Sequence, residues 1–158
     1  MTGIMRRRRQ WVALAVLAVG AAGAFGVRAV GPAGGADAAM LALGSELYAE
    51  HCASCHGADL EGQPDWKRRL PSGRVPAPPH DATGHTWHHP DGVLMRITRE
   101  GVAAVVGGGY ESDMPGFGDV LGDDDIRAVL EFIKSTWPER ERRYQAEMSR
   151  WELEEAEE

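Results

Sequence analysis

The sequence contains only two cysteines, Cys52 and Cys55, among its 158 residues. A structural zinc site needs four ligands at matching spacing, and there is no second cysteine pair to complete one. Imidazoles could still complete such a site, because the chain has a histidine run at positions 80, 85, 88 and 89. A disulfide between the two cysteines would close too small a loop to stabilise the chain much. We therefore expect the pair to have a chemical role rather than a structural one.

Basic residues are scarce beyond the first 30 positions. Five of the 17 lysines and arginines lie within those 30 positions, and all 24 acidic residues lie after them, so the rest of the chain has a net charge of −12. Such a surface repels phosphate, which excludes a nucleic-acid binder. It favours soluble partners that have a basic docking face.

The common signatures of an enzyme are also missing. No Ser/His/Asp set and no carboxylate pair stands out. The glycine triplet at 107–109 lacks the lysine and hydroxyl residue of a phosphate-binding loop. The acidic cluster at 123–125 lacks the spacing and the downstream glutamate of a calcium loop. We interpret the first as a turn and the second as a helix start, and we expect a protein that is not an enzyme.

One uncharged run, from Trp11 to Val27, follows four arginines at positions 6–9. Because positive charge stays in the cytoplasm, this pattern predicts an export signal or membrane anchor over residues 1–30, with the rest of the chain translocated. The run is long for a signal-peptide core and slightly short for a membrane span, so cleavage stays open. We favour an anchored domain on the periplasmic side of the cytoplasmic membrane, with a soluble periplasmic protein as the alternative. Residues 31–42, which include Gly and Pro, are predicted to be a linker.

The two cysteines belong to the stretch Cys52-Ala53-Ser54-Cys55-His56. This order is the attachment signature of a c-type haem, in which the thiols hold the porphyrin and the histidine is the proximal iron ligand. A thioredoxin-like pair would instead follow a strand. The segment before Cys52 has helical spacing, with apolar or ring-bearing residues at Leu43, Leu47, Tyr48 and His51. A carbonyl within 76–79 is expected to accept the second ring N–H of His56, but the spacing does not identify which one.

Met114 is the predicted second iron ligand. It lies in a loop far enough along the chain to reach the opposite face of the haem, and Pro115 restricts the backbone beside it. Met95 falls inside a predicted helix, where methionine is more often core filler. The competing ligands are the histidines of the run, His80, His85, His88 and His89.

Three further helical segments are predicted after an irregular loop at 57–90 that is rich in Gly, Pro, Asp and His. Asp91 is the expected N-cap of a short helix that Gly101 ends. A longer helix is predicted from about Asp123 to Thr136, with an apolar stripe from Ile126 to Ile133 and three aspartates at its positive end. Residues 138–158 are expected to form a charged, solvated helical tail. Trp66, Leu70 and Trp87 are expected to line the haem pocket.

The Cys52–Gly57 stretch, Gly44 and Tyr48 before it, the Met114–Phe117 loop and the final helix together resemble the class I cytochrome c family. The resemblance covers roughly residues 43–137. It implies an all-α cytochrome c fold of three to four helices around one covalently attached haem c, with a long irregular loop between the first and middle helices. It also implies that the first and last helices cross closely, with Gly44 at the Ile126–Ile133 stripe.

The function implied is that of an exported mono-haem carrier of single electrons, with iron bound by His56 and Met114. Two alternatives stay open. One is a haem enzyme or small-ligand sensor with a displaceable sixth ligand. The other is a haem subunit of a larger dehydrogenase or oxidase.

Overall fold

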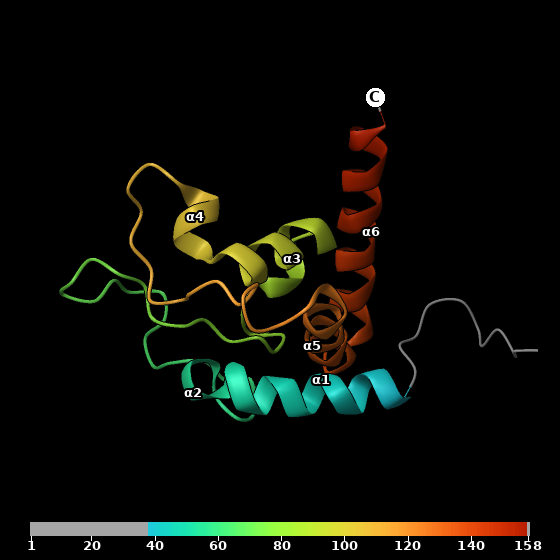
Figure 1. Cartoon of the computed structure of the whole chain (residues 1–158), viewed down its shortest axis with the longest axis horizontal. Helices are drawn as coiled ribbons and strands as arrows, with labels where there is room; N and C mark the ends of the chain where they lie inside the picture. The colour runs from blue at the N-terminus through green and yellow to red at the C-terminus, as the bar shows by residue number, and fades with distance from the viewer. Residues whose placement is uncertain (1–37, 158) are drawn as a thin grey trace, which may run out of the picture. The chain divides into compact units, whose positions relative to one another are not determined.

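The structure is a computed structural model, and it describes residues 38–157. Within that range it contains six α-helices, one short 3-10 helix (η1) and no strand, which confirms the predicted all-α class but with more helices than expected (Figure 1). The elements are α1 (Ala38–His51), α2 (Ala53–His56), η1 (Thr86–His88), α3 (Asp91–Glu100), α4 (Val102–Val106), α5 (Asp123–Ser135) and α6 (Glu139–Ala156). The predicted export segment lies outside the described residues. None of the described helices is long and apolar enough to cross a membrane.

Among the described helices, α1 and α5 make the most extensive contact, and they cross (Figure 1). Gly44 lies at this contact. A Cβ built on Gly44 would lie 2.0 Å from the backbone oxygen of Ala128, so only glycine fits at this contact. Gly44 therefore meets α5 as predicted, but at Ala128 and Phe132 and not at the apolar residues of the stripe. Helix α1 begins at Ala38, so residues 38–42 are helical and not part of a linker.

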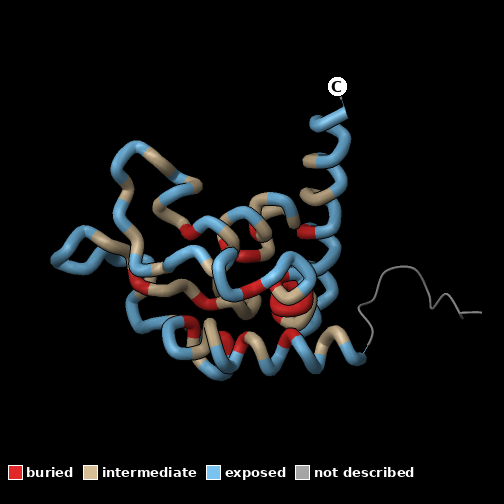
Figure 2. The backbone as a smooth tube through the Cα atoms, viewed as in Figure 1, coloured by how far each residue is buried: buried red, intermediate tan, exposed pale blue. Residues whose placement is uncertain are grey.

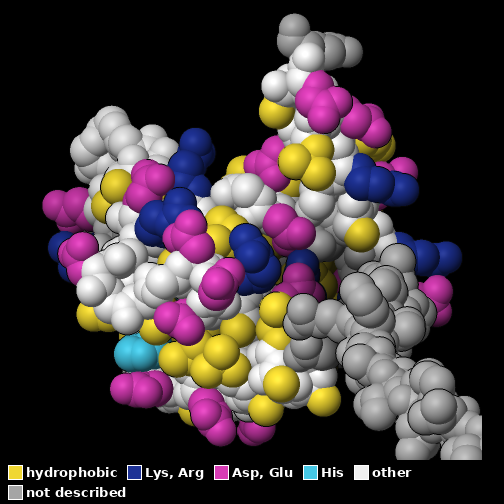
Figure 3. Space-filling model, turned by 45° about the vertical axis from the view of Figure 1, so that its right-hand side comes forward, with side chains coloured by type: hydrophobic (Ala, Val, Ile, Leu, Met, Phe, Trp, Pro, Cys, Tyr) yellow, Lys and Arg dark blue, Asp and Glu magenta, His cyan; other side chains and the backbone are white. Residues whose placement is uncertain are grey.

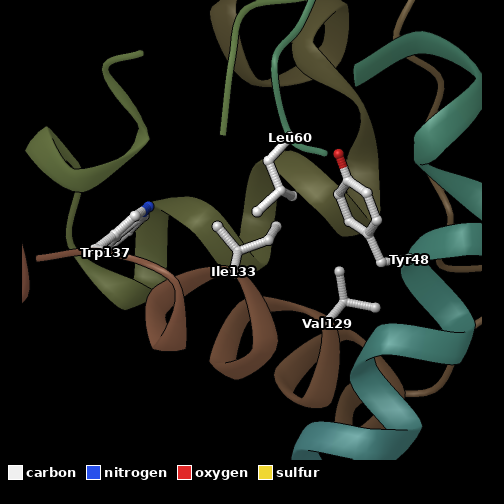
Figure 4. Packing of buried hydrophobic residues seen from close by; sticks show 5 residues of the cluster. All are labelled: Tyr48, Leu60, Val129, Ile133 and Trp137. Atoms are coloured by element: carbon white, nitrogen blue, oxygen red, sulfur yellow. The ribbon is translucent and has the colours of Figure 1, made fainter. Parts of the chain in front are cut away.

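Two hydrophobic clusters form the core, and α5 contributes to both (Figure 2). One contains Tyr48, Leu60, Val129, Ile133 and Trp137 (Figure 4). The other contains Leu94, Leu121, Ile126 and Leu130. The predicted stripe of α5 is thus buried along its length, and it joins α1 and the following loop on one side to α3 on the other.

The start of α3 differs from the prediction. Asp91 is the first residue of the helix, and Pro90 holds the N-cap position without a side-chain hydrogen bond. The Asp91 carboxylate instead accepts hydrogen bonds from Lys134 and Gln145, at 3.1 and 2.8 Å. Asp91 therefore joins α3 to α5 and α6. Gly101, with φ of 86°, ends α3 as predicted.

Helix α6 is more than a solvated tail. Its Tyr144 and Trp151 are largely exposed, while Glu141 and Gln145 are buried. The Gln145 amide also contacts the backbone oxygen of His89 at 3.3 Å, and Ser149 Oγ accepts the N–H of Asp91 at 3.0 Å. The helix therefore packs on η1 and α3 through polar groups, which the apolar spacing of the sequence does not reveal.

Charge on the surface is mixed rather than purely acidic. Figure 3 shows acidic side chains spread over the visible face, with lysines and arginines between them. Among the described residues, several arginines form ion pairs, such as Arg99 with Asp123 and Arg74 with Asp113.

Candidate cofactor site

Cys52, Cys55 and His56 lie together at the junction of α1 and α2. The Cys52 N–H donates to the Tyr48 carbonyl over 2.9 Å, and the Cys52 carbonyl accepts the N–H groups of Cys55 and His56 at 3.1 and 2.9 Å. Helix α2 ends at Gly57, whose φ of 84° favours glycine. Both cysteines are free thiols, and the structure contains no disulfide between them.

The two thiols differ in their surroundings. Cys55 is exposed, whereas Cys52 is partly buried. Burial raises the pKa of the Cys52 thiol to about 11, and the nearby Cys55 adds to the effect. At neutral pH the Cys52 sulfur therefore keeps its proton, and it faces the core cluster around Tyr48.

His56 is buried, with 6% of its surface exposed, and its Nδ1 lies 2.8 Å from the carbonyl oxygen of Pro78. Because a carbonyl only accepts hydrogen bonds, Nδ1 must carry the proton. Burial lowers the pKa of His56 and outweighs the opposite effect of the Pro78 bond. The ring is therefore neutral, and its Nε2 has a free lone pair for a metal. Pro78 is the carbonyl that the sequence left unidentified.

Two glycines allow the proline run to approach His56. A Cβ on Gly62 would lie 2.4 Å from the Pro79 nitrogen, and one on Gly84 would lie 1.9 Å from the Pro79 oxygen. The Gly62 N–H also donates to the His56 carbonyl over 2.7 Å. The chain after His56 thus turns back tightly, and this turn brings the Pro78 carbonyl to the imidazole.

A second histidine lies against the first. The rings of His56 and His80 are stacked, with centroids 3.9 Å apart and planes inclined by 24°. His80 Nδ1 and Thr86 Oγ1 share a hydrogen bond of 2.8 Å. Burial lowers the pKa of His80 well below its usual value, and the neighbouring His56 and His85 act in the same direction. His80 entered the sequence reasoning only as a rival ligand, and its contact with His56 was missed.

The other histidines of the run have aromatic neighbours. His85 stacks on Trp66 at 5.5 Å, and His88 lies 3.7 Å from Trp87 between ring centroids. Trp87 packs on the core cluster around Tyr48 and meets Tyr144 of α6 edge to face. Trp87 therefore joins the loop to α6. Leu70, also expected in the pocket wall, is 42% exposed.

Met114 lies on a separate segment, between α4 and α5, and it is partly buried. Its N–H donates to Ser112 Oγ over 3.1 Å. After it, the Phe117 N–H donates to the Thr98 carbonyl of α3 over 2.9 Å, and a Cβ on Gly116 would lie 2.6 Å from the Arg99 oxygen. The backbone that carries Met114 is therefore held against the end of α3.

The segment is also held on the other side of Met114. Asp113 pairs with Arg74, and Glu111 lies 3.5 Å from the Arg74 Nε. Further back, Gly107, Gly108 and Gly109 all have positive φ and no neighbour that a Cβ would meet. The segment that carries Met114 therefore follows a glycine turn, and contacts with Arg74 and with α3 hold it on both sides of Met114.

These residues fit a covalently attached haem on the basis of their donor chemistry. Two free thiols three positions apart precede a buried histidine whose Nδ1 is already bound, so Nε2 is the nitrogen available to iron. The zinc alternative has no comparable support. Among residues 38–157, no group of three or more Cys, His, Asp or Glu side chains is placed to bind a metal ion.

Comparison with known proteins agrees with this site. Residues 41–137, more than half of the chain, match the model of the family described as cytochrome c. The matched region begins in α1 and ends just after α5, so it contains Cys52, Cys55, His56 and Met114. No solved structure was found to match the chain. The chain belongs to the cytochrome c family, whose members bind haem c and typically transfer electrons.

Proposed function

We propose that this protein is an exported mono-haem cytochrome c that carries single electrons between redox proteins. The observation that carries the proposal is His56, which is buried, bound through Nδ1 to the Pro78 carbonyl and next to two free cysteines. The bound haem supplies an iron that alternates between the ferrous and ferric states. The protein's own residues hold, orient and shield it.

Each site residue has a separate task in this proposal. Cys52 and Cys55 would hold the haem through thioether bonds, formed when each S–H adds across a vinyl group of the porphyrin, so the group would stay attached. His56 would bind iron through Nε2, and the Pro78 bond keeps the proton on Nδ1 and increases the basicity of the ring. Met114 would supply a thioether sulfur as the second ligand, a donor that favours the reduced state and raises the potential.

Support for Met114 comes from the way its segment is fixed. Bonds to α3 hold the chain just after it, and the Arg74 pair holds the chain just before it. A ligand on such a segment stays in place in both oxidation states, so electron transfer needs no ligand exchange. If His56 and Met114 both bind iron, the site would have no open position for substrate, which suits electron transfer.

The test replaces Met114 with Ala and, as the matched control, Met148 with Ala on α6. The ferric wild type is expected to show the sulfur-to-iron charge-transfer band, Met148→Ala to retain it and Met114→Ala to lose it. Retention of the band in Met114→Ala would mean that another methionine, such as Met95, binds iron, whereas a wild type without the band would point to the histidine run.

Carbon monoxide distinguishes electron transfer from ligand chemistry. Slow, incomplete binding to the ferrous wild type at neutral pH is expected, because Met114 occupies the sixth position. Rapid, complete binding would favour a haem enzyme or a ligand sensor. The glycine turn before Met114 is the feature that keeps this second function open.

The same proposal places the domain in the periplasm, anchored to the cytoplasmic membrane by residues 1–30. The described part of the chain ends in the acidic helix α6, and partners with a basic docking face are proposed on grounds of charge. Haem staining of membrane and soluble fractions tests the anchor. Co-purification from detergent-solubilised membranes tests whether the protein is a subunit of a larger complex.

A further inference from the structure

We propose that His80 is a positioning residue for His56. Its ring lies flat against the His56 imidazole and fixes the plane of that ring, and with it the direction in which Nε2 points. The inference rests on the proposed role of His56 as the iron ligand, and it assigns His80 a task that iron binding alone does not require.

The geometry shows why one hydrogen bond does not suffice. The 2.8 Å bond from Nδ1 to the Pro78 carbonyl fixes one atom of the His56 ring. The angle of a hydrogen bond to a carbonyl oxygen can vary widely, so the His56 ring could still tilt about that contact. A second flat ring with its centroid 3.9 Å away blocks tilting towards that side. The edge contact and the face contact together define the plane.

His80 is itself held firmly enough for this task. Its ring nitrogen Nδ1 is bound to Thr86 Oγ1 at 2.8 Å, and Thr86 is buried at the start of η1. Its backbone is fixed independently, because its N–H donates to the Leu60 carbonyl over 2.8 Å and its carbonyl accepts the Trp137 indole N–H at 2.7 Å. Leu60 and Trp137 both belong to the buried core cluster. A side-chain substitution at His80 therefore leaves the backbone bonds in place.

The plane of an imidazole that binds iron would matter because its π orbitals overlap with particular iron d orbitals. A ring that is free to tilt presents a distribution of orientations, and a ring held on its face presents one. His80 therefore acts on the electronic state of the iron site through His56, without touching the iron.

The experiment uses the intact, haem-loaded protein and compares four variants with the wild type. His80→Ala removes the stacked face, and His80→Phe restores a flat ring without its nitrogens. Thr86→Val removes the hydroxyl that holds the His80 ring but keeps the ring itself. His85→Ala is the control, because His85 belongs to the same run and stacks on Trp66 instead.

The readouts are the electron paramagnetic resonance spectrum of the ferric protein and its reduction potential. We expect His80→Ala to shift and broaden the low-spin signal and to shift the potential. His80→Phe should restore a narrow signal close to that of the wild type, Thr86→Val should broaden it less than His80→Ala, and His85→Ala should leave it unchanged. The Thr86→Val result keeps the test valid if His80→Ala fails to fold.

A His80→Ala signal as narrow and unshifted as that of the wild type would overturn the inference. So would a His80→Phe spectrum that matches His80→Ala, because ring stacking would then not be the cause. Failure of the proposed function looks different. In that case the wild type itself lacks covalent haem or a low-spin ferric signal, whatever residue stands at position 80.

Discussion

Replacement of Gly44 by alanine tests the helix crossing on which the fold depends. The added Cβ would lie 2.0 Å from the Ala128 oxygen, 2.6 Å from the Ala128 carbonyl carbon and 2.9 Å from the Phe132 Cβ. Two of these three atoms belong to the α5 backbone, which cannot rotate away as a side chain does. Helices α1 and α5 must therefore separate by roughly 1.5 Å to restore ordinary contacts.

Two opposing effects decide the magnitude. Alanine is better than glycine inside a helix by about 1 kcal/mol. Overpacking of a tight core costs about 1–3 kcal/mol, and a clash between two backbones belongs at or above the upper end. A net loss of about 2 kcal/mol lowers the Tm of a domain of this size by roughly 10 °C. The separation also loosens Tyr48, which lies one turn after Gly44 and whose hydroxyl donates to the Gly57 carbonyl over 2.9 Å.

The assay is thermal unfolding of the haem-loaded protein, followed by circular dichroism. Gly122→Ala is the matched control, because it makes the same chemical change at the start of α5, where the nearest atom to a Cβ is an Asp125 oxygen at 3.5 Å. The control should lie within a few degrees of the wild type. A Gly44→Ala protein with an unchanged or higher Tm would refute the reasoning about the crossing.

Three further substitutions test other contacts. Trp137→Phe removes a buried indole N–H that donates over 2.7 Å to the loop after α2, and urea titration should show a loss of about 1–3 kcal/mol. Gln145→Ala removes the amide that joins α6 to η1 and α3, so hydrogen exchange should become faster in α6 and stay unchanged in α1 and α5. Burial alone would lower the pKa of Lys134, but the hydrogen bond to Glu131 and the charge of Asp91 outweigh it and raise the pKa. The stability that Lys134 gains from these two carboxylates is therefore complete below the ordinary lysine pKa. It is lost as the pH rises through the pKa of Lys134 in the folded protein. Above about pH 10, the Tm of Lys134→Met should therefore fall less than that of the wild type.

The sequence allowed prediction of those parts of the fold that local patterns encode. The order of Cys52, Cys55 and His56 predicted a site, the spacing from Ile126 to Ile133 predicted α5, and a glycine in a helical segment predicted a close crossing. Each of these signals depends on residues that are near each other in the chain. The buried helix and the cytochrome c family are as expected, and Gly44 does contact α5, although at Ala128 and Phe132 and not at the stripe itself.

Other features depend on contacts between distant segments. Pro78 was one of four candidate carbonyls, and only the turn at Gly62 and Gly84 selects it. Aspartate is a residue type typical of N-caps, but the Asp91 carboxylate accepts hydrogen bonds from Lys134 and Gln145 instead.

The stacking of His80 on His56 joins positions 24 residues apart, and no periodicity links them. For α6 the misleading signal was charge, because the charged helix packs through the buried Gln145 and through the edge-to-face contact of Tyr144 with Trp87. The iron ligands themselves, including Met114, stay a prediction that spectroscopy must test.

The mass of the intact, denatured protein tests the central claim most directly. The account predicts the polypeptide mass plus that of one haem, retained in acid and organic solvent because Cys52 and Cys55 hold it covalently. Cys52→Ala/Cys55→Ala should lose the added mass. A wild-type protein purified from cells able to attach haem that has the mass of the polypeptide alone, or of more than one haem, would contradict the account.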